Sequence, residues 1–372
     1  MRVEAVELRR CQLPLREVFR TSYGVERTRD VLLVRVRTDV GDGWGECGAP
    51  AAPGYTDETV EVAHRALRDR LVPALGGHDV HLDGLDAVLD GSCDTPMARA
   101  ALELALIDAL LRAGNQSVAH WLGATRTRVP AGIALGVEAT IDDSLARVAG
   151  AVDAGYRRVK LKIEPGRDVA VLDAVRAAFP DLALQADANG AYRGDDIEHL
   201  RAIDAARLQC IEQPFPADDL AAHAALARAI ATPVCLDESI RSSSDAARAI
   251  DMAACSVVNV KAARVGGLLE ARRLHDACVE REVPVWCGGM LDTGIARAAN
   301  VALAALPGFT IPGDVSGSDR WFDVELTQPL RLDDDGCIRV PNGVGIGVDV
   351  DGDAIESCTE SSEVLPVSPR RS

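Results

Sequence analysis

The feature that most constrains the fold is a regular alternation of short apolar runs with amphipathic, helix-length stretches between residues 129 and 313. Runs of this length separated by helices are typical of parallel strands joined by crossover connections. Eight such units favour closure into a (β/α)8 barrel over a doubly wound open sheet, which the same alternation also permits. The eight runs are residues 129–136, 158–163, 183–189, 209–214, 233–239, 256–262, 284–290 and 309–313.

The first 125 residues have a different pattern and predict a separate α+β unit. Alternating residues over 2–10 and 31–38 predict strands, and the spacing of apolar residues over 57–124 predicts helices, most clearly over 97–114. The glycines at 41, 43 and 45 predict a hairpin turn, because a dinucleotide-binding loop needs a helix directly after it. The barrel is therefore expected over residues 126–320.

The chain after the barrel is predicted to divide into two parts. Residues 321–350 return to strand-like alternation, and we expect them to pack back onto the N-terminal unit. Residues 351–372 are rich in Ser, Glu and Pro, which predicts a mobile tail.

The composition excludes several classes of partner. The formal net charge is −17, from 40 basic and 57 acidic residues, so nucleic acids and anionic membrane surfaces are poor partners. Neither a membrane span nor a signal peptide is expected, because charged residues interrupt the apolar stretches and the start of the chain. Ten scattered cysteines without a Cys-x-x-Cys pair predict free thiols in a reducing cytoplasm.

Charged residues occur at the ends of five consecutive predicted barrel strands, where strands buried on both faces should be apolar. Successive charges lie 24 or 25 residues apart, which is one strand–helix unit, so all of them are expected on one ring at the barrel mouth. A single charge at a strand end is usually a helix cap or a surface residue, but five in register are not explained that way. The ring consists of Lys160 and Lys162, Asp187, Glu212, Asp237 and Lys261.

This ring suits the removal of a proton next to a carboxylate. Three converging carboxylates repel each other unless a cation lies between them, and oxygen ligands without histidine or cysteine favour Mg²⁺ or Mn²⁺. A divalent cation would stabilise the enolate, and lysines on either side could remove and return protons. The sequence therefore predicts a metal-dependent enzyme acting on a small carboxylate.

The ring residues, with their neighbours, resemble the enolase superfamily in its muconate-lactonizing-enzyme subgroup. The motifs are Lys-x-Lys at 160–162, Asp-x-Asn at 187–189, Glu-Gln-Pro at 212–214, Asp-Glu-Ser at 237–239 and Asn-Val-Lys at 259–261. The resemblance covers roughly residues 1–350. It implies an α/β fold, a modified (β/α)7β TIM-type barrel whose α+β capping domain includes the C-terminal return segment. It also implies Mg²⁺ and self-association into a homo-oligomer.

Further motifs resemble the o-succinylbenzoate synthase / N-succinylamino acid (N-acylamino acid) racemase family. They are Ala-Arg-Val-Gly-Gly at 263–267, Pro-Val-Trp-Cys-Gly-Gly-Met at 284–290, Thr-Gly-Ile at 293–295, Pro-Gly-Asp at 312–314 and Phe-Arg-Thr-Ser-Tyr-Gly at 19–24, which includes Ser22. The resemblance implies that Asp187, Glu212 and Asp237 bind the metal, with Asn189 beside it. It implies that Lys162 removes the α-proton, that Lys261 stabilises the enolate or acts as the second acid/base, and that Lys160 contacts the substrate carboxylate and tunes Lys162.

A second group of residues is expected near the substrate. Phe19, Tyr23 and Tyr55 would close over its distal end, although they could equally be core residues of the cap. Arg264, Gly289, Met290 and Asp292 fall in the family motifs and are expected around the pocket. Asp292 stands where the family commonly has Glu, and this departure bears on substrate identity. Ala262-Ala263 replaces a more usual Pro-Gly, and this departure bears on the position of Arg264.

The expected activity is dehydration to o-succinylbenzoate in menaquinone synthesis, or racemisation of N-succinylamino acids in the same site. A dipeptide epimerase would carry Asp-x-Asp where residues 313–316 read Gly-Asp-Val-Ser, and a mandelate-racemase-like enzyme would carry a histidine in 286–289, which has none. A muconate cycloisomerase-like enzyme remains an alternative. A non-catalytic barrel that serves as a scaffold or binding protein is the alternative from another class.

Overall fold

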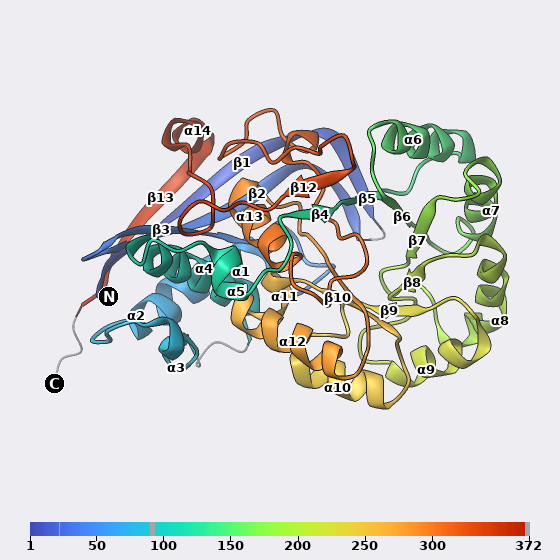
Figure 1. Cartoon of the computed structure of the whole chain (residues 1–372), viewed down its shortest axis with the longest axis horizontal. Helices are drawn as coiled ribbons and strands as arrows, with labels where there is room; N and C mark the ends of the chain where they lie inside the picture. The colour runs from blue at the N-terminus through green and yellow to red at the C-terminus, as the bar shows by residue number, and fades with distance from the viewer. Residues whose placement is uncertain (22, 90–93, 369–372) are drawn as a thin grey trace.

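The computed structural model describes residues 1–21, 23–89 and 94–368, and it places a capping unit against a barrel (Figure 1). Ser22, Cys93 and residues 369–372 of the predicted tail lie outside the described residues. The nine described cysteines are all free thiols. Among the described residues, no helix is long and apolar enough to cross a membrane.

The capping unit is built on an antiparallel sheet of four strands. β1 and β2 extend beyond the strands predicted at 2–10 and 31–38, and the hairpin that joins them reaches the barrel mouth. Apolar residues such as Val6, Leu8 and Val34 are buried in these strands, and residues 31–34 of β2 are buried on both faces of the sheet. The strands are β1 (Val3–Thr21), β2 (Gly24–Thr38), β3 (Gly41–Cys47) and β13 (Thr359–Pro366), in the order β13-β1-β2-β3.

The predicted hairpin is present, but its turn lies at residues 39–40, and the glycines at 41, 43 and 45 lie within β3. The predicted place of the turn is wrong because β3 needs the glycines at 43 and 45 to pack directly on the long helix α4 (Pro96–Ala113). A Cβ atom on Gly43 or Gly45 would collide with the backbone of that helix. The helix predicted at 97–114 is confirmed. The remaining helices of this unit are α1 (Val60–Ala66), η1 (Leu67–Leu71), α2 (Val72–Ala74), η2 (Leu82–Gly84), α3 (Leu85–Leu89) and α5 (Val118–Leu122).

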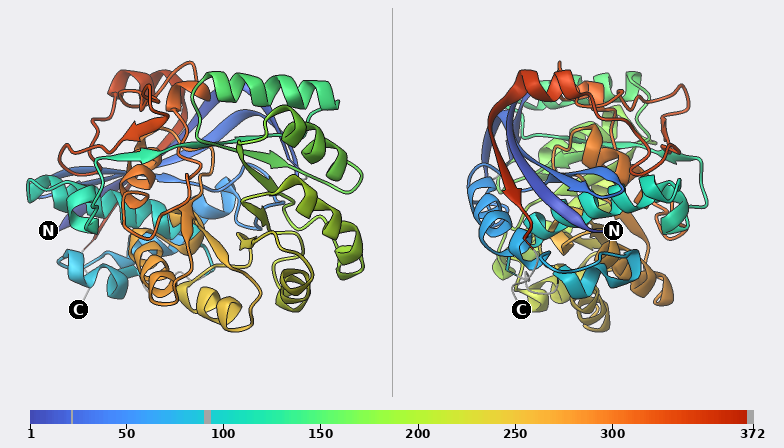
Figure 2. Two further views of the ribbon diagram at one scale, coloured as in Figure 1. Left: turned by 45° about the vertical axis from the view of Figure 1, so that its right-hand side comes forward. Right: turned by 90° about the vertical axis from the view of Figure 1, so that its left-hand side faces the viewer.

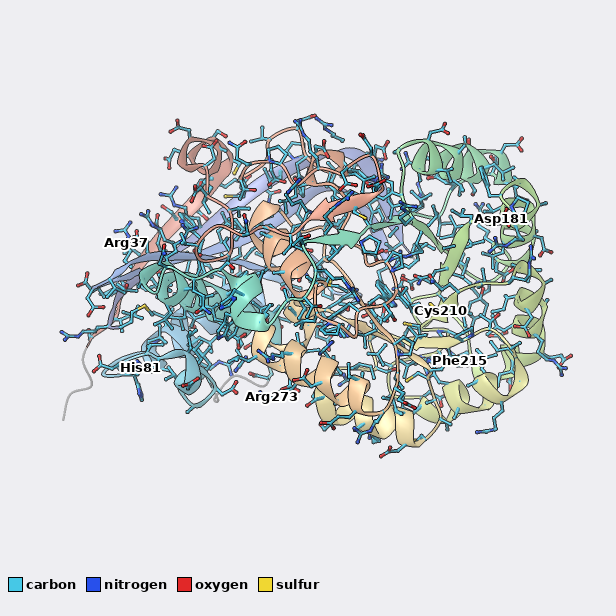
Figure 3. All side chains as sticks on the ribbon, viewed as in Figure 1. Arg37, His81, Asp181, Cys210, Phe215 and Arg273 are labelled. Atoms are coloured by element: carbon cyan, nitrogen blue, oxygen red, sulfur yellow. The ribbon has the colours of Figure 1, made fainter. Side chains whose placement is uncertain are left out.

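The barrel contains a parallel sheet of seven strands, in the order β11-β10-β9-β8-β7-β6-β5. Helices lie along the outside of this curled sheet (Figure 2), as the alternation of strand and helix predicts. Figure 3 labels Cys210, which opens β8, and Phe215, which follows it. The strands are β5 (Gly132–Leu135), β6 (Arg158–Lys162), β7 (Ala183–Asp187), β8 (Cys210–Glu212), β9 (Val234–Leu236), β10 (Val257–Val260) and β11 (Val285–Cys287).

The eighth predicted run, 309–313, is not a strand, and this part of the prediction is wrong. It is joined to the flanking strands by single bridges, from Phe309 to Val285 and from Gly313 to Ala131. Pro312 has no N–H to donate to a ladder, which accounts for the irregular pairing. The segment still closes the gap between β11 and β5, because Gly132 N donates to Gly313 O at 2.7 Å. The structure is thus a TIM-barrel-like sheet with an antiparallel capping unit.

Most of the barrel helices connect consecutive strands. They are α6 (Ile141–Asp153), α7 (Val169–Ala178), η3 (Gly194–Asp196), α8 (Ile197–Leu200), η4 (Arg201–Ala206), α9 (Leu220–Ala229), α10 (Ser243–Asp251), α11 (Ala262–Val265), α12 (Leu268–Glu280) and α13 (Gly294–Leu303).

The C-terminal region returns to the cap, with little regular structure over 321–350 beyond β12 (Cys337–Arg339), which pairs with β4 (Arg128–Pro130). The short helix η5 (Ser318–Arg320) precedes it. The prediction of a mobile tail is wrong for residues 352–366, which form α14 (Gly352–Cys358) and β13. β13 lies beside β1 (Figure 1) and pairs with the edge of that strand. Its polar side chains predicted mobility, but the backbone hydrogen bonds to β1 do not depend on side-chain type.

Candidate active site

The ring of charges predicted from the sequence is present at the carboxyl ends of the barrel strands. Lys162 and Asp187 end β6 and β7 and are paired in register, and Asp187 is paired with Glu212 at the end of β8. Asp237 follows β9 directly, and Lys261 follows β10. The parallel register therefore brings residues 25 positions apart in the chain side by side, as the spacing predicts.

Lys160 is the most deeply embedded of the three lysines. Its Nζ lies 2.8 Å from a carboxylate oxygen of Glu212, 2.8 Å from one of Asp314 and 3.2 Å from one of Asp187. Burial alone would lower the pKa of Lys160, but the three carboxylates outweigh it and hold that pKa well above its usual value. Asp314 is fixed in turn by Arg158, whose Nη1 lies 2.6 Å away and whose side chain is completely buried. Lys160 is therefore held as an ammonium group.

Lys162 points from the same side of β6 towards the next strand. Its Nζ donates to Asp187 Oδ2 at 2.6 Å and to Asn189 Oδ1 at 2.6 Å. The Asn189 amide donates its own hydrogen to Glu238 Oε1 at 2.9 Å, so the asparagine bridges the lysine and a further acid. Asn189 is thus placed to orient Lys162.

Lys261 lies on the other side of the ring, and three strands separate β10 from β6 in the sheet. Its Nζ donates to Asp237 Oδ2 at 2.8 Å, and it lies 4.4 Å from the centre of the Tyr55 ring. Arg264 donates a second charged hydrogen bond to Asp237. Burial would raise the pKa of Asp237, but Lys261 and Arg264 outweigh burial and hold it below its usual range. Gly288 approaches closely here, since a Cβ atom on it would meet the Lys261 side chain.

A cavity of about 320 Å³ lies over the ring, between the barrel and the cap. The three lysines line it, whereas the acids Asp187, Glu212 and Asp237 are no more than 1% exposed and do not, and Arg264 is also buried beneath it. The cap supplies the opposite wall from Phe19, Thr21, residues 23–30, residues 50–53 and Tyr55. The other predicted residues that line the cavity are Phe19, Tyr23, Tyr55, Asn189, Gly289, Met290 and Asp292.

The three aromatic residues predicted to cover the substrate take different positions. Tyr23 Oη donates to Glu238 Oε1 at 3.0 Å, which ties the tip of the β1–β2 hairpin to the barrel. Tyr55 Oη donates to Asp237 Oδ1 at 2.8 Å, so this residue lies against the ring itself and not only against a distal pocket. Phe19 packs edge-on against Trp321, with the centres of the two rings 5.4 Å apart.

Asp292 holds the loop after β11 in shape. Its Oδ2 accepts hydrogen bonds from Met290 N and Asn300 Nδ2, both at 3.1 Å. Arg297 Nη2 donates to the Asp292 carbonyl at 2.6 Å. Burial and the nearby Asp292 raise the pKa of Glu46, a buried acid of β3, to about 7. The residue that departs from the family pattern is therefore part of a packed polar network at the cavity edge.

The three carboxylates supply the type of oxygen ligand that a hard divalent cation prefers. Burial raises the pKa of Glu212, and repulsion from Asp187 and Asp237 raises it further, so the three carboxylates lie close enough to repel. Glu238 Oε2 is buried without a hydrogen-bond partner among the described residues. Over residues 1–21, 23–89 and 94–368, no three acidic, histidine or cysteine side chains are gathered around one point as metal ligands. Here Lys160 bridges Asp187 and Glu212 and supplies the positive charge between them.

Sequence reasoning did not assign roles to two acids of this site, Asp314 and Glu238. Asp314 follows the irregular run 309–313, and its position at the eighth strand end was the signal that could have identified it as a partner of Lys160. Glu238 directly follows Asp237 in the Asp-Glu-Ser motif, which by itself indicates no separate role for it. Both accept hydrogen bonds or ion pairs from ring or cap residues.

The fold and the site define a capped barrel whose acids and lysines are gathered at the strand ends, the position of active sites in barrel enzymes. Two family models match the chain: Mandelate racemase / muconate lactonizing enzyme, N-terminal domain, over residues 5–123, and Enolase C-terminal domain-like, over residues 143–354. The chain belongs to this mandelate racemase / muconate lactonizing enzyme family of the enolase superfamily, as the motifs predicted.

Individual relatives extend over nearly the whole chain. It is 49% identical over 350 residues to N-succinylamino acid racemase of Amycolatopsis sp., which covers 94% of this chain and 95% of the relative. It is 43% identical over 365 residues to o-succinylbenzoate synthase of Geobacillus kaustophilus, and the match covers 98% of this chain and 97% of the relative. A crystal structure of an enolase superfamily member from Listeria innocua superposes with a TM-score of 0.95 at 37% identity, over 99% of this chain and 100% of the other.

Proposed function

We propose that the protein removes a proton α to a substrate carboxylate, as an o-succinylbenzoate synthase, an N-succinylamino acid racemase, or both. The observation that carries the proposal is the pair of lysines, Lys162 and Lys261, which enter one cavity from strands on opposite sides of a carboxylate ring. Two amines that face the same substrate atom from two sides can remove a proton from one face and return one to the other. The relatives named for both reactions support this proposal.

Asp187, Glu212 and Asp237 would hold Mg²⁺, the cation used in this superfamily, with Mn²⁺ as a substitute. When bound, the cation stabilises the negative charge that develops on the substrate carboxylate. The contribution of the acids is to supply oxygen ligands at fixed positions on three neighbouring strands. Lys160, kept as an ammonium group by its carboxylate partners, would contact the substrate carboxylate and balance charge beside them.

The lysines would divide the proton transfers between them. In both reactions, Lys162 as the free amine accepts the α-proton. In racemisation, the Lys261 ammonium group gives its proton to the opposite face of the same carbon. In dehydration, no proton returns to that carbon. Lys261 stabilises the negative charge, and the proton taken up by Lys162 passes to the departing hydroxyl group, which leaves as water. Asn189, bonded to Lys162 at 2.6 Å, would fix the direction of its amine.

A racemase is the second candidate within this proposal, because the relative of that name is 49% identical. The test is to incubate the purified protein with Mg²⁺ and either the cyclohexadiene precursor of o-succinylbenzoate or one enantiomer of an N-succinylamino acid. Formation of o-succinylbenzoate or loss of optical rotation is expected, and removal of the metal with a chelator should abolish either activity. Absence of both activities, with proton exchange also absent, would refute the proposal.

A further inference from the structure

Arg29 is a buried cation of the cap whose hydrogen-bonding capacity is mostly unused. The residue lies on β2 and is 2% exposed. Its Nη1 donates to the Ala49 carbonyl at 3.0 Å, whereas its Nε and Nη2 have no hydrogen-bond partner among the described residues. A buried guanidinium without an anion is costly, since it has lost its water and gained little in return. A group that completes it is therefore expected to come from outside the chain.

Three acids of the cap, Asp30, Glu58 and Glu46, are engaged with other partners. Asp30, the next residue, accepts from Arg10 Nε at 2.9 Å and from Arg10 Nη2 at 2.5 Å. The Glu58 carboxylate accepts from two backbone N–H groups at the start of α4. The Glu46 carboxylate accepts hydrogen bonds from the Thr293 backbone N–H at 2.9 Å and from the Thr293 hydroxyl group at 2.6 Å.

Arg29 faces the barrel and not the helices of the cap. Residues 29, 31 and 33 of β2 share one face, and Leu33 is paired with Glu46 of β3. Glu46 reaches the start of α13 from that face, so the face is directed at the loop after β11. Arg29 accordingly lines the same cavity as Lys162 and Lys261. An anion seated on Arg29 would share that cavity with the reacting lysines.

A second buried arginine of the cavity, Arg297, is less suited to a ligand. Its Nη1 donates to Ser316 O at 2.8 Å and its Nη2 to Asp292 O at 2.6 Å, which leaves only Nε without a partner in the described part of the chain. Arg29 keeps both Nε and Nη2, two neighbouring donors of one planar group. That pair matches the two oxygens of a carboxylate.

We propose that Arg29 binds a second carboxylate of the substrate, at the far end of its acyl chain, and so selects dicarboxylic acyl substrates of succinyl length over monocarboxylic ones. This inference rests on the proposed function, because the first carboxylate and the α-carbon are assigned to the barrel. In this proposal the cap takes part in substrate choice through Arg29, a charged residue buried in its sheet.

The test compares an N-succinylamino acid with the N-butyryl derivative of the same amino acid, in which a methyl group replaces the distal carboxylate. The readout is kcat/KM for exchange of the α-proton in D₂O. The wild-type protein should favour the succinyl substrate, and Arg29→Met should reduce this preference by about 10- to 100-fold, the value of a charge-assisted hydrogen-bonded pair. The butyryl substrate should react at a similar rate in both proteins.

Arg27→Met is the matched control, because Arg27 lies two positions away on the same strand, also lines the cavity and is exposed. It should keep the preference. An unchanged preference in Arg29→Met, or an equal loss in Arg27→Met, would overturn the inference. If wild type exchanges neither substrate, the proposed function fails, and calorimetric binding of the two compounds then tests Arg29 alone.

Arg29→Lys keeps the charge but loses the planar pair of donors, so it should retain only part of the preference. If neither Arg29 variant folds, binding to the wild-type protein still decides. Equal affinities for the succinyl and butyryl compounds would overturn the inference, and tighter binding of the succinyl compound, abolished by competing succinate but not by butyrate, would support it.

Discussion

The barrel side and the cap side of the cavity satisfy their charges in different ways. On the barrel side, each lysine of the ring has a carboxylate oxygen within 2.8 Å. On the cap side, Arg29 has one backbone acceptor and two donors without partners among the described residues. The charges of the barrel side are thus paired within the chain, whereas the cap side holds the group that we propose a ligand completes. Under the proposed function, this difference would separate the residues that perform the chemistry from those that choose the substrate.

The largest effect is expected from breaking the barrel side. Glu212→Gln removes one of three neighbouring carboxylates while keeping its size, so it should lower kcat/KM by about 10³-fold and weaken the response to Mg²⁺. The measurement is steady-state kinetics across a range of Mg²⁺ concentrations. Glu198→Gln, which changes an exposed acid of α8, should have no effect. Full activity in Glu212→Gln would contradict the assignment of the ring.

A second large effect concerns stability. Asp314→Asn removes the shared anion of Lys160 and Arg158, and breaking a buried pair in this way costs about 3–5 kcal/mol in the free energy of unfolding. Urea denaturation measures it. Asp323→Asn is the control. Asp323 and its partner Arg16 are both exposed, and such a pair contributes at most about 1 kcal/mol. Equal losses in the two variants would show that the Asp314 pairs are not important for stability.

The cap contains an acid that should make stability depend on pH. Burial raises the pKa of Glu58 from 4.5 to about 7, although N–H groups of Met97 and Ala98 oppose the shift, as Arg70 does, while Asp94 adds to it. The folded state then binds more protons than the unfolded state between pH 4.5 and 7, so stability falls as the pH rises through this window. The loss is at most about 3 kcal/mol.

Glu58→Gln cannot ionise at this position. The free energy of unfolding of the wild type should therefore fall relative to that of Glu58→Gln as the pH rises from about 4.5 to 7. Urea denaturation at several pH values measures the difference between the two proteins. Stability curves that run parallel over this range would show that Glu58 does not titrate there.

The smallest effect sharpens the boundary between the two sides. Tyr55 belongs to the cap, but its hydroxyl group donates to Asp237 and its ring lies over Lys261. Tyr55→Phe removes one hydrogen bond and keeps the ring, so kcat/KM should fall only about fivefold, which corresponds to about 1 kcal/mol. A loss of 100-fold or more in the same kinetic assay would place the hydroxyl group among the groups that move protons.

The barrel side could be predicted from the sequence because parallel strands convert a regular spacing into proximity. Asp187 and Glu212 are 25 residues apart in the chain and are paired in the sheet. The same logic failed at 309–313, where Pro312 interrupts the pairing, and so Asp314 was not recognised as the partner of Lys160. In the tail, side-chain composition indicated mobility, but backbone pairing with β1 decided the structure of β13.

The cap side could not be predicted in the same way. Arg29 is one of several arginines on β2, and nothing in its sequence neighbourhood distinguishes it from Arg27 or Arg35. Its burial depends on the loop that contains Ala49 and on the approach of the barrel, both distant in the chain. The position of Tyr55 against Lys261 likewise results from packing between two domains, which no local pattern encodes.

The claim that the amine at the end of β6 takes a hydrogen from the α-carbon is tested most directly by isotope exchange. The wild-type protein and Lys162→Ala are incubated in D₂O with Mg²⁺ and an N-succinylamino acid, and incorporation of deuterium at the α-carbon is followed by NMR. We expect wild type to incorporate deuterium and Lys162→Ala to do so at least about 10³-fold more slowly. Incorporation at the wild-type rate in a folded Lys162→Ala protein would contradict the account.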